Sequence, residues 1–163
     1  MKSNLRVEIK QQKPFDSLEQ EVHLNLERTA AVLTHAFAEA LKPYDITPTQ
    51  YNVLRILRGV GPEGLCRNDV RDRMVSQVPD VTRLMDRLED QMLIERERST
   101  TDRRQVASRI TAKGLDLLRA LDGPVVEIHR HQLGHMSQEQ LRALADLLEL
   151  ARTPSATADH VIQ

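Results

Sequence analysis

A change of hydrophobic period just after residue 90 limits what this chain can fold into more than any other feature. Over residues 79–90, apolar side chains recur at i, i+3, i+4 and i+7, the spacing of one face of an α-helix. The next segments, 92–98 (MLIERER) and 105–111 (QVASRIT), alternate apolar and polar residues as short strands do. The sequence therefore predicts a helix followed at once by a β-hairpin, whose tip is STTDRR, residues 99–104.

Two helix starts are marked further upstream. Asp16, with Glu19 three residues later, has the pattern of a capping box, and leucines at helical spacing follow it as far as Pro43, which ends the helix. Thr47, in the segment TPTQ, is the expected N-cap of a second helix. The loop at 59–64 (GVGPEG) is rich in glycine, but no GK[ST] follows, so it predicts a turn rather than a phosphate-binding loop.

A short helix and a turn should separate that loop from the amphipathic helix. Residues 65–75 predict the short helix, with Leu65, Val70 and Met74 inward, and residues 76–78 predict the turn. Pro79 then opens the amphipathic helix.

The regions outside this segment are also mainly helical. Thr111 is expected to cap a long helix that runs toward His135, with Gly123-Pro124 as a candidate kink. Ser137 is expected to cap a final helix. At the other end, residues 3–10 alternate leucine, valine and isoleucine with polar residues, which predicts a strand-like arm.

Two short helices joined by a tight turn and followed by a hairpin are typical of a winged helix-turn-helix. The expected fold is mainly α with a small β-hairpin: a winged helix-turn-helix DNA-binding domain plus a helical dimerisation domain. The expected division is an N-terminal arm at 1–14, the winged helix-turn-helix at 47–111, a helical dimerisation region at 15–46 and 112–152, and a flexible tail at 153–163.

Composition excludes several classes of protein. Hydrophobic residues make up 40% and charged residues 29%, which is typical of a globular protein rather than a disordered one. Aromatic residues make up only 2%, which argues against base stacking on aromatic platforms. The single cysteine, Cys66, excludes an internal disulfide and a cysteine-rich zinc module. No apolar run reaches the ~18 residues of a membrane span and no signal-peptide core is present, so we expect a soluble cytoplasmic protein.

The net charge of −1 gives no global sign of nucleic-acid binding, but the distribution of charge does. Residues 96–109 hold five arginines against two acids, which makes the hairpin locally basic. Arginine suits bidentate recognition of phosphate and of guanine edges. No signature of a hydrolase, a nucleotide-binding enzyme or a metalloprotease occurs, so we expect neither an enzyme nor a cofactor.

The chain resembles the MarR family of bacterial transcription regulators. The matching stretches are VPDVTRLMDRLE (78–89), LIERER (93–98), DRR (102–104) and ITAKGLDLL (110–118). The resemblance implies a homodimer that binds a pseudo-palindromic operator in double-stranded DNA, usually as a repressor, and that a small phenolic or aromatic ligand releases in many members. The first long helix and the last two carry apolar stripes that one small core cannot bury, which independently predicts a dimer interface.

The candidate DNA contacts lie at the start of the amphipathic helix and in the hairpin tip, where the reading helix enters the major groove and the wing reaches phosphates. They are Gln77, Pro79, Asp80, Thr82, Arg83, Arg87, Arg103 and Arg104. A carboxylate repels phosphate, so Asp80 should accept from cytosine or brace an arginine. Asp102 is expected to be a wing brace that holds an arginine such as Arg83 or Arg87.

Other candidates depend more on the resemblance. It implies an effector cleft near the first two helices, for which His35, Phe37, Tyr44 and Tyr51 are candidate lining residues, with core packing as the alternative. Cys66 has no neighbouring His or Lys to activate it, so an inert thiol is expected. His131 and His135 have a spacing that could bind zinc, with His129 nearby, but no further ligand completes a site, so no metal is expected.

Two rival functions remain open. The winged helix, residues 65–110, carries 10 arginines against 9 acids, so the chain could be a helical interaction module that no longer binds DNA. A metal-sensing member of the same family is the other alternative.

Overall fold

The computed structural model describes residues 4–98 and 106–153, and it confirms a mainly helical winged helix-turn-helix. The chain forms two compact units, residues 1–122 and 123–163, and the boundary between them falls inside α6. The elements are α1 (Asn4–Glu8), α2 (Leu18–Leu41), the 3-10 turn η1 (Lys42–Tyr44), α3 (Pro48–Val60), the 3-10 turn η2 (Gly61–Glu63), β1 (Leu65–Cys66), α4 (Arg67–Asp72), α5 (Val81–Asp90), β2 (Ile94–Arg98), β3 (Val106–Ile110), α6 (Ala112–Leu133) and α7 (Gln138–Arg152).

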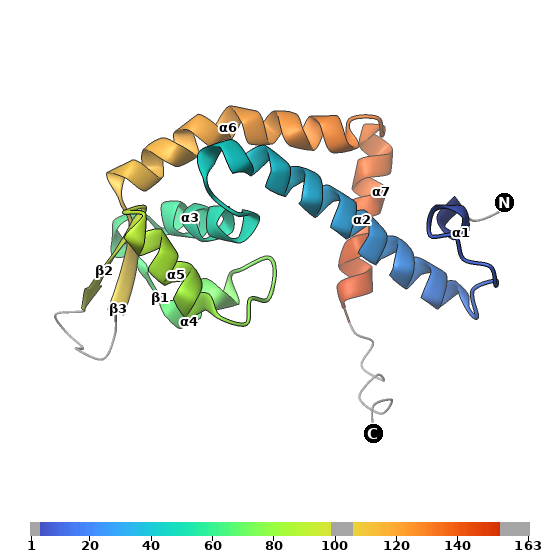
Figure 1. Ribbon diagram of the computed structural model, residues 1–163, viewed down its shortest axis with the longest axis horizontal. Helices are drawn as coiled ribbons and strands as arrows, with labels where there is room; N and C mark the ends of the chain where they lie inside the picture. The colour runs from blue at the N-terminus through green and yellow to red at the C-terminus, as the bar shows by residue number, and fades with distance from the viewer. Residues whose placement is uncertain (1–3, 99–105, 154–163) are drawn as a thin grey trace, which may run out of the picture. The chain divides into compact units, whose positions relative to one another are not determined.

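The first unit holds the winged helix around one core. Helices α3, α4 and α5 gather beside a small antiparallel sheet of order β1-β3-β2 (Figure 1). The core is made of apolar side chains from α3, α5 and the first half of α6 that solvent hardly reaches: Val53, Leu54, Leu57, Met85, Leu88, Leu118 and Leu121. Of these, Met85 and Leu88 lie on the apolar face that the helical spacing of residues 79–90 predicts.

Local capping chemistry fixes where most helices begin. Thr47 accepts from the backbone N–H of Gln50, whose side chain accepts from the Thr47 N–H, and Ser137 starts α7 with the same reciprocal capping box. Both predicted starts are confirmed. The N-cap of α2 is Ser17 rather than Asp16, because the Ser17 hydroxyl accepts from the N–H of Gln20.

The segment predicted as one helix over 65–75 is in part a strand. Leu65 and Cys66 form β1, which pairs with Ser108 and Ala107 of β3, and α4 begins only at the next residue. Gly64 makes the turn into β1 with a φ of +69°, and a Cβ there would lie 2.7 Å from the carbonyl oxygen of Ser108. The sheet thus has three strands, not the two of the predicted hairpin.

The strand-like arm predicted at residues 3–10 is wrong, because this segment contains the helix α1. Leu5 is buried, whereas Val7 and Ile9 are exposed. Alternation favours a strand only where a neighbouring strand offers hydrogen bonds, and the described sheet contains only β1, β2 and β3. Glu8 of α1 instead pairs with Arg28 of α2 at 4.0 Å.

The start of α6 packs against the turn between α5 and β2. The hydroxyl of Thr111 accepts from the N–H of Gly114, which confirms it as the cap, and donates to the carbonyl of Met92. Lys113 donates to the carbonyl of Gln91. At Gly114 the two backbones are so close that a Cβ would lie 2.3 Å from the carbonyl oxygen of Leu93.

Further along, α6 is tied to α3 before it leaves the first unit. Arg58 of α3 makes a two-pronged contact with the carboxylate of Asp122, at 2.9 and 3.0 Å. Pro124 lies inside the helix, and α6 ends at Leu133, two residues before the predicted end. None of the helices in the described ranges, 4–98 and 106–153, is long and apolar enough to span a membrane.

We predict that Gly114→Ala lowers the free energy of unfolding by about 1–3 kcal/mol, because α6 must move off the backbone of Leu93. Gly59→Ala in α3 is the matched control, since beyond its chain neighbours and its own helix backbone no heavy atom lies within 4 Å of a Cβ at that helical glycine. The control should be neutral or stabilise by up to ~1 kcal/mol through helix propensity. Urea unfolding of both variants measures the difference, and equal effects would contradict the packing constraint.

Candidate nucleic-acid interface

The amphipathic helix α5 buries one face and exposes the other. Val81, Leu84, Met85 and Leu88 are buried, as the spacing predicts. The helix begins at Val81 and not at Pro79, because Asp80 is its N-cap and accepts from the N–H of Arg83 at 2.9 Å. The polar side of α5 is therefore presented by a helix whose start is fixed by a side-chain cap.

The structure brings six of the predicted DNA-contact residues together on α5 and in the turn that leads into it. All six are exposed: Gln77, Pro79, Asp80, Thr82, Arg83 and Arg87. The other three predicted wing residues, Asp102, Arg103 and Arg104, lie outside the described residues. Their roles as wing brace and phosphate contacts stay predictions.

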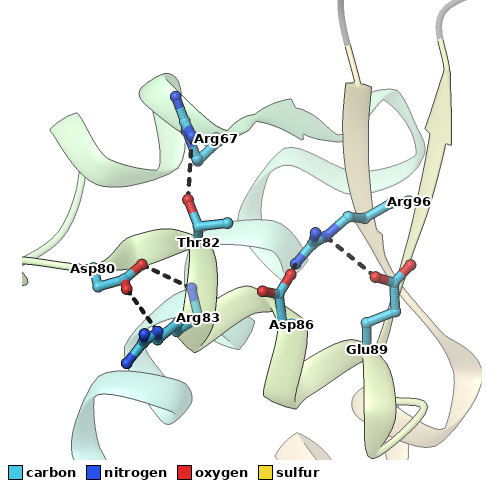
Figure 2. A network of polar contacts seen from close by, with 7 residues as sticks. All are labelled: Arg67, Asp80, Thr82, Arg83, Asp86, Glu89 and Arg96. Atoms are coloured by element: carbon cyan, nitrogen blue, oxygen red, sulfur yellow. Dashed lines mark hydrogen bonds and ion pairs between the residues drawn. The ribbon is translucent and has the colours of Figure 1, made fainter.

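Asp80 has an intramolecular role that accounts for a carboxylate at this place. Besides capping α5, it pairs with the guanidinium of Arg83 at 3.2 Å (Figure 2). Of the two roles expected for Asp80, bracing an arginine is the one present in the free protein. The side chain of Arg83 is 82% exposed, so this ion pair lies at the surface.

A second arginine ties the wing to α5, and sequence reasoning missed it. Arg96 of β2 lies 2.7 Å from the carboxylate of Asp86 and 3.4 Å from that of Glu89, both on α5 (Figure 2). Its side chain is 22% exposed, and its Nε and Nη2 atoms are buried without an aligned hydrogen bond. Charge proximity to two carboxylates is what compensates the burial of this guanidinium.

The alternation of β2 contained a signal for this contact. Ile94 is buried, so the period of two places Arg96 on the same inward side of the strand. A charged side chain at an inward position requires partners, and the acids of the preceding helix are the nearest in sequence.

A third arginine holds the sheet to the loop before it. Arg109 of β3 donates to the carbonyl of Pro62 at 2.6 Å and pairs with Glu97 of β2. On the other side of the domain, the N–H of Val75 donates to the side chain of Asn52 on α3 at 2.9 Å. These contacts fix the two segments that flank α5, the wing base and the turn after α4.

The contact between α4 and α5 involves an exposed arginine that the sequence did not single out. Arg67, the first residue of α4, donates from Nη1 to the hydroxyl oxygen of Thr82 at 3.1 Å (Figure 2). Both side chains are exposed, and no sequence pattern indicates that residues 15 positions apart should meet.

The residues proposed for an effector cleft differ in their surroundings. Tyr44 lines a cavity of about 220 Å³ with Lys113 and Leu117. Phe37 and Tyr51 pack edge to face with ring centroids 5.5 Å apart. Burial of Tyr51 raises its pKa above the usual value. The fourth candidate, His35, is exposed, so the ligand-lining role of this set stays a prediction.

Polar contacts surround a neighbouring cavity of about 490 Å³ at the end of α5. Gln91 accepts from the buried side chain of Gln50 and donates to the carbonyl of Asp45, each at 3.2 Å. Arg87 and Lys42 also line this cavity. The end of α5 is thereby held against the start of α3.

The described residues place neither Cys66 nor the histidine candidates in a metal-binding cluster. Cys66 is half-buried and donates to the carboxylate of Asp69 at 3.1 Å. Within residues 4–98 and 106–153, no group of three or more His, Cys, Asp or Glu side chains is placed to hold a metal ion.

Comparison with known proteins identifies relatives of this arrangement. The model of the MarR family matches residues 44–105, from the end of η1 to the residue before β3. A solved MarR transcription factor from Planctomyces limnophilus is 42% identical, with 84% of this chain and 99% of that chain covered and a TM-score of 0.65.

Two further matches carry informative names. The transcriptional repressor MdtR of Bacillus subtilis is 30% identical over 63% of this chain and 64% of its own length. A mutant MarR of E. coli complexed with operator DNA has a TM-score of 0.75 at 20% identity, with 85% of this chain and 100% of that chain covered.

We predict that Arg96→Met lowers the free energy of unfolding by about 1–3 kcal/mol, because Asp86 and Glu89 lose their counter-charge while the apolar stem is kept. Arg119→Met is the control, since that arginine pairs with Asp116 on its own helix and is 71% exposed. Its loss should cost less than ~0.5 kcal/mol. Thermal or urea unfolding measures both, and equal costs would show that Arg96 does not tie β2 to α5.

Proposed function

The chain belongs to the MarR family of transcription regulators, and on that premise we propose that it is a homodimeric repressor that binds a pseudo-palindromic operator in double-stranded DNA. We also propose that the protein is cytoplasmic, because a repressor of this kind acts where the bacterial DNA is. Because the family consists of regulators, the expectation that the chain is not an enzyme is confirmed.

The observation that carries the DNA-binding proposal is the exposed, polar and firmly held start of α5. Thr82 and Arg83 are exposed there, Arg87 is exposed in the last turn, and the contacts of Asp80 and Arg96 hold the helix in place. In winged helix-turn-helix proteins the second helix of the motif enters the major groove. The E. coli MarR structure that carries operator DNA has the same fold, which supports the proposal by analogy.

Exposed apolar side chains on the long helices support the homodimer. On α2 they are Leu18, Val22, Leu26 and Val32; on α6, Val126; and on α7, Leu147 and Leu150. Apolar residues repeated along several helices are typical of an unfilled interface. A two-fold dimer would place two α5 helices ~34 Å apart, one turn of DNA.

We also propose that a small phenolic or aromatic ligand releases the protein from its operator. The cavity at Tyr44 combines an aromatic edge with the ammonium group of Lys113, a pairing suited to a phenol or an aromatic acid. No observation favours the metal-sensing alternative. The rival that lacks DNA binding is separated by the next experiment.

We predict a footprint with two half-sites one DNA turn apart on genomic fragments, including the gene's own upstream region. Binding should weaken steeply with salt, because contacts to phosphate release counterions. Arg103→Ala and Arg104→Ala should each be tested in that assay. Loss of one phosphate contact lowers the log–log salt slope by ~0.9 for each protomer bound.

An interaction module without DNA binding would give no protected site and no salt-dependent retardation. A footprint with unchanged slopes in both arginine variants would keep the regulator but remove the wing contacts.

For the dimer, we predict that Leu147→Asp on α7 shifts sedimentation toward the monomer, because the carboxylate would be buried in the interface. Val75→Asp in the turn after α4 is the control, since this valine is also exposed, at 88% against 63% for Leu147, and lies outside the long helices proposed for the interface. If Leu147→Asp remains dimeric at micromolar concentration, α7 is not part of the interface.

A further inference from the structure

We propose that Arg67, the first residue of α4, is a contact to the DNA backbone and also fixes what Thr82 can recognise on a base edge. The proposal rests on the proposed DNA-binding function and adds a residue that neither the sequence patterns nor the wing predicts.

The contact between the two side chains is direct. Nη1 of Arg67 donates to Oγ1 of Thr82 at 3.1 Å and joins the start of α4 to the first turn of α5. Figure 2 shows this contact, with Arg67 on α4 reaching the side chain of Thr82 on α5. Thr82 follows Asp80 and Val81 at the end of α5 that would enter the groove.

This hydrogen bond sets the direction of the Thr82 hydroxyl. A hydroxyl has one hydrogen to donate and lone pairs that accept. Oγ1 accepts from a charged donor, and that positive charge repels a second N–H donor from the remaining lone pair, so the O–H of Thr82 is left to donate outward. Thr82 should therefore recognise acceptors in the major groove, which are guanine N7 and O6, adenine N7 and thymine O4. Cytosine, which presents only its amino donor there, should be disfavoured.

Arg67 is also available to bind a phosphate of the DNA backbone. Among the described residues it makes no ion pair, whereas Arg83 is paired with Asp80 and Arg96 with Asp86. The nearest acid in sequence, Asp69, accepts from the thiol of Cys66.

A guanidinium has five N–H donors, and the contact with Thr82 uses one of them. The first helix of the motif crosses the DNA backbone while the second lies in the groove. An exposed arginine that opens this first helix therefore has donors available for a phosphate at the edge of the groove.

The first arm of the test measures charge. Binding of the full-length protein to its footprinted operator is titrated with salt for wild type, Arg67→Ala and Arg119→Ala. We expect Arg67→Ala to weaken binding about tenfold or more per protomer and to lower the salt slope by ~0.9 per protomer. Arg119→Ala, which removes the same charge from α6, should leave the slope unchanged.

The second arm measures base preference, which a merely structural role would not alter. Each operator position is substituted in turn, and wild type is compared with Thr82→Val, Arg67→Ala and Arg67→Lys. Wild type should disfavour cytosine by about fivefold at one position per half-site, and Thr82→Val should lose that preference while its salt slope is kept.

Arg67→Lys keeps the charge but not the planar fork, so it should keep the slope and relax the same base preference. Adding Arg67→Lys to Thr82→Val should then cause no further change in preference. Circular-dichroism melting verifies that the variants are folded.

The outcomes separate this proposal from the proposed function. If wild type shows no salt-sensitive operator binding, the DNA-binding function itself is wrong. If wild type binds and Arg67→Ala keeps both slope and base preference, DNA binding stands and the role of Arg67 is overturned. If Arg67→Ala lowers the salt slope but leaves the base preference unchanged, the role of Arg67 in orienting Thr82 is overturned.

Discussion

The contact of Arg96 with Asp86 and Glu89 is the interaction on which the position of β2 against α5 depends. The apolar face of α5 fixes how deep the helix lies, but apolar contacts are not directional. A half-buried guanidinium between two carboxylates adds direction, because moving the strand relative to the helix separates charges that water does not fully screen. Strand β2 and α5 are therefore held in a fixed position relative to each other, and a contact made by either constrains the other.

The features that could be predicted from the sequence are those that short stretches of chain decide. Thr47, Thr111 and Ser137 cap their helices through residues three positions away, and the buried face of α5 follows from spacing alone. The strand β1 could not be predicted, since its two residues are a strand only because Ser108 and Ala107 lie beside them. The five-residue helix α1 was mistaken for a strand because so short an alternation does not distinguish the two periods.

The candidate interface divides in the same way. Exposed positions such as Thr82 and Arg83 follow from the helix period and from the order of elements. The partners of those side chains do not: Arg67 reaches Thr82 only because the turn after α4 brings two helices together, and that turn is held by Asn52. Sequence patterns thus locate the surface, whereas the hydrogen bonds that give each side chain its donor or acceptor character require the folded chain.

The pairing of Arg83 with Asp80 means that this arginine carries its own counterion. Because this pair is exposed, exchanging its carboxylate for a phosphate of any DNA replaces one solvated ion pair with another and changes the free energy little. The arginine gains more where the DNA offers a second acceptor, such as the edge of a guanine, in the right geometry. Because Asp80 competes with the DNA for Arg83, it lowers the affinity for every DNA sequence, and it lowers the affinity least for the correct sequence. Asp80, which repels phosphate, would in this way sharpen the choice among sites.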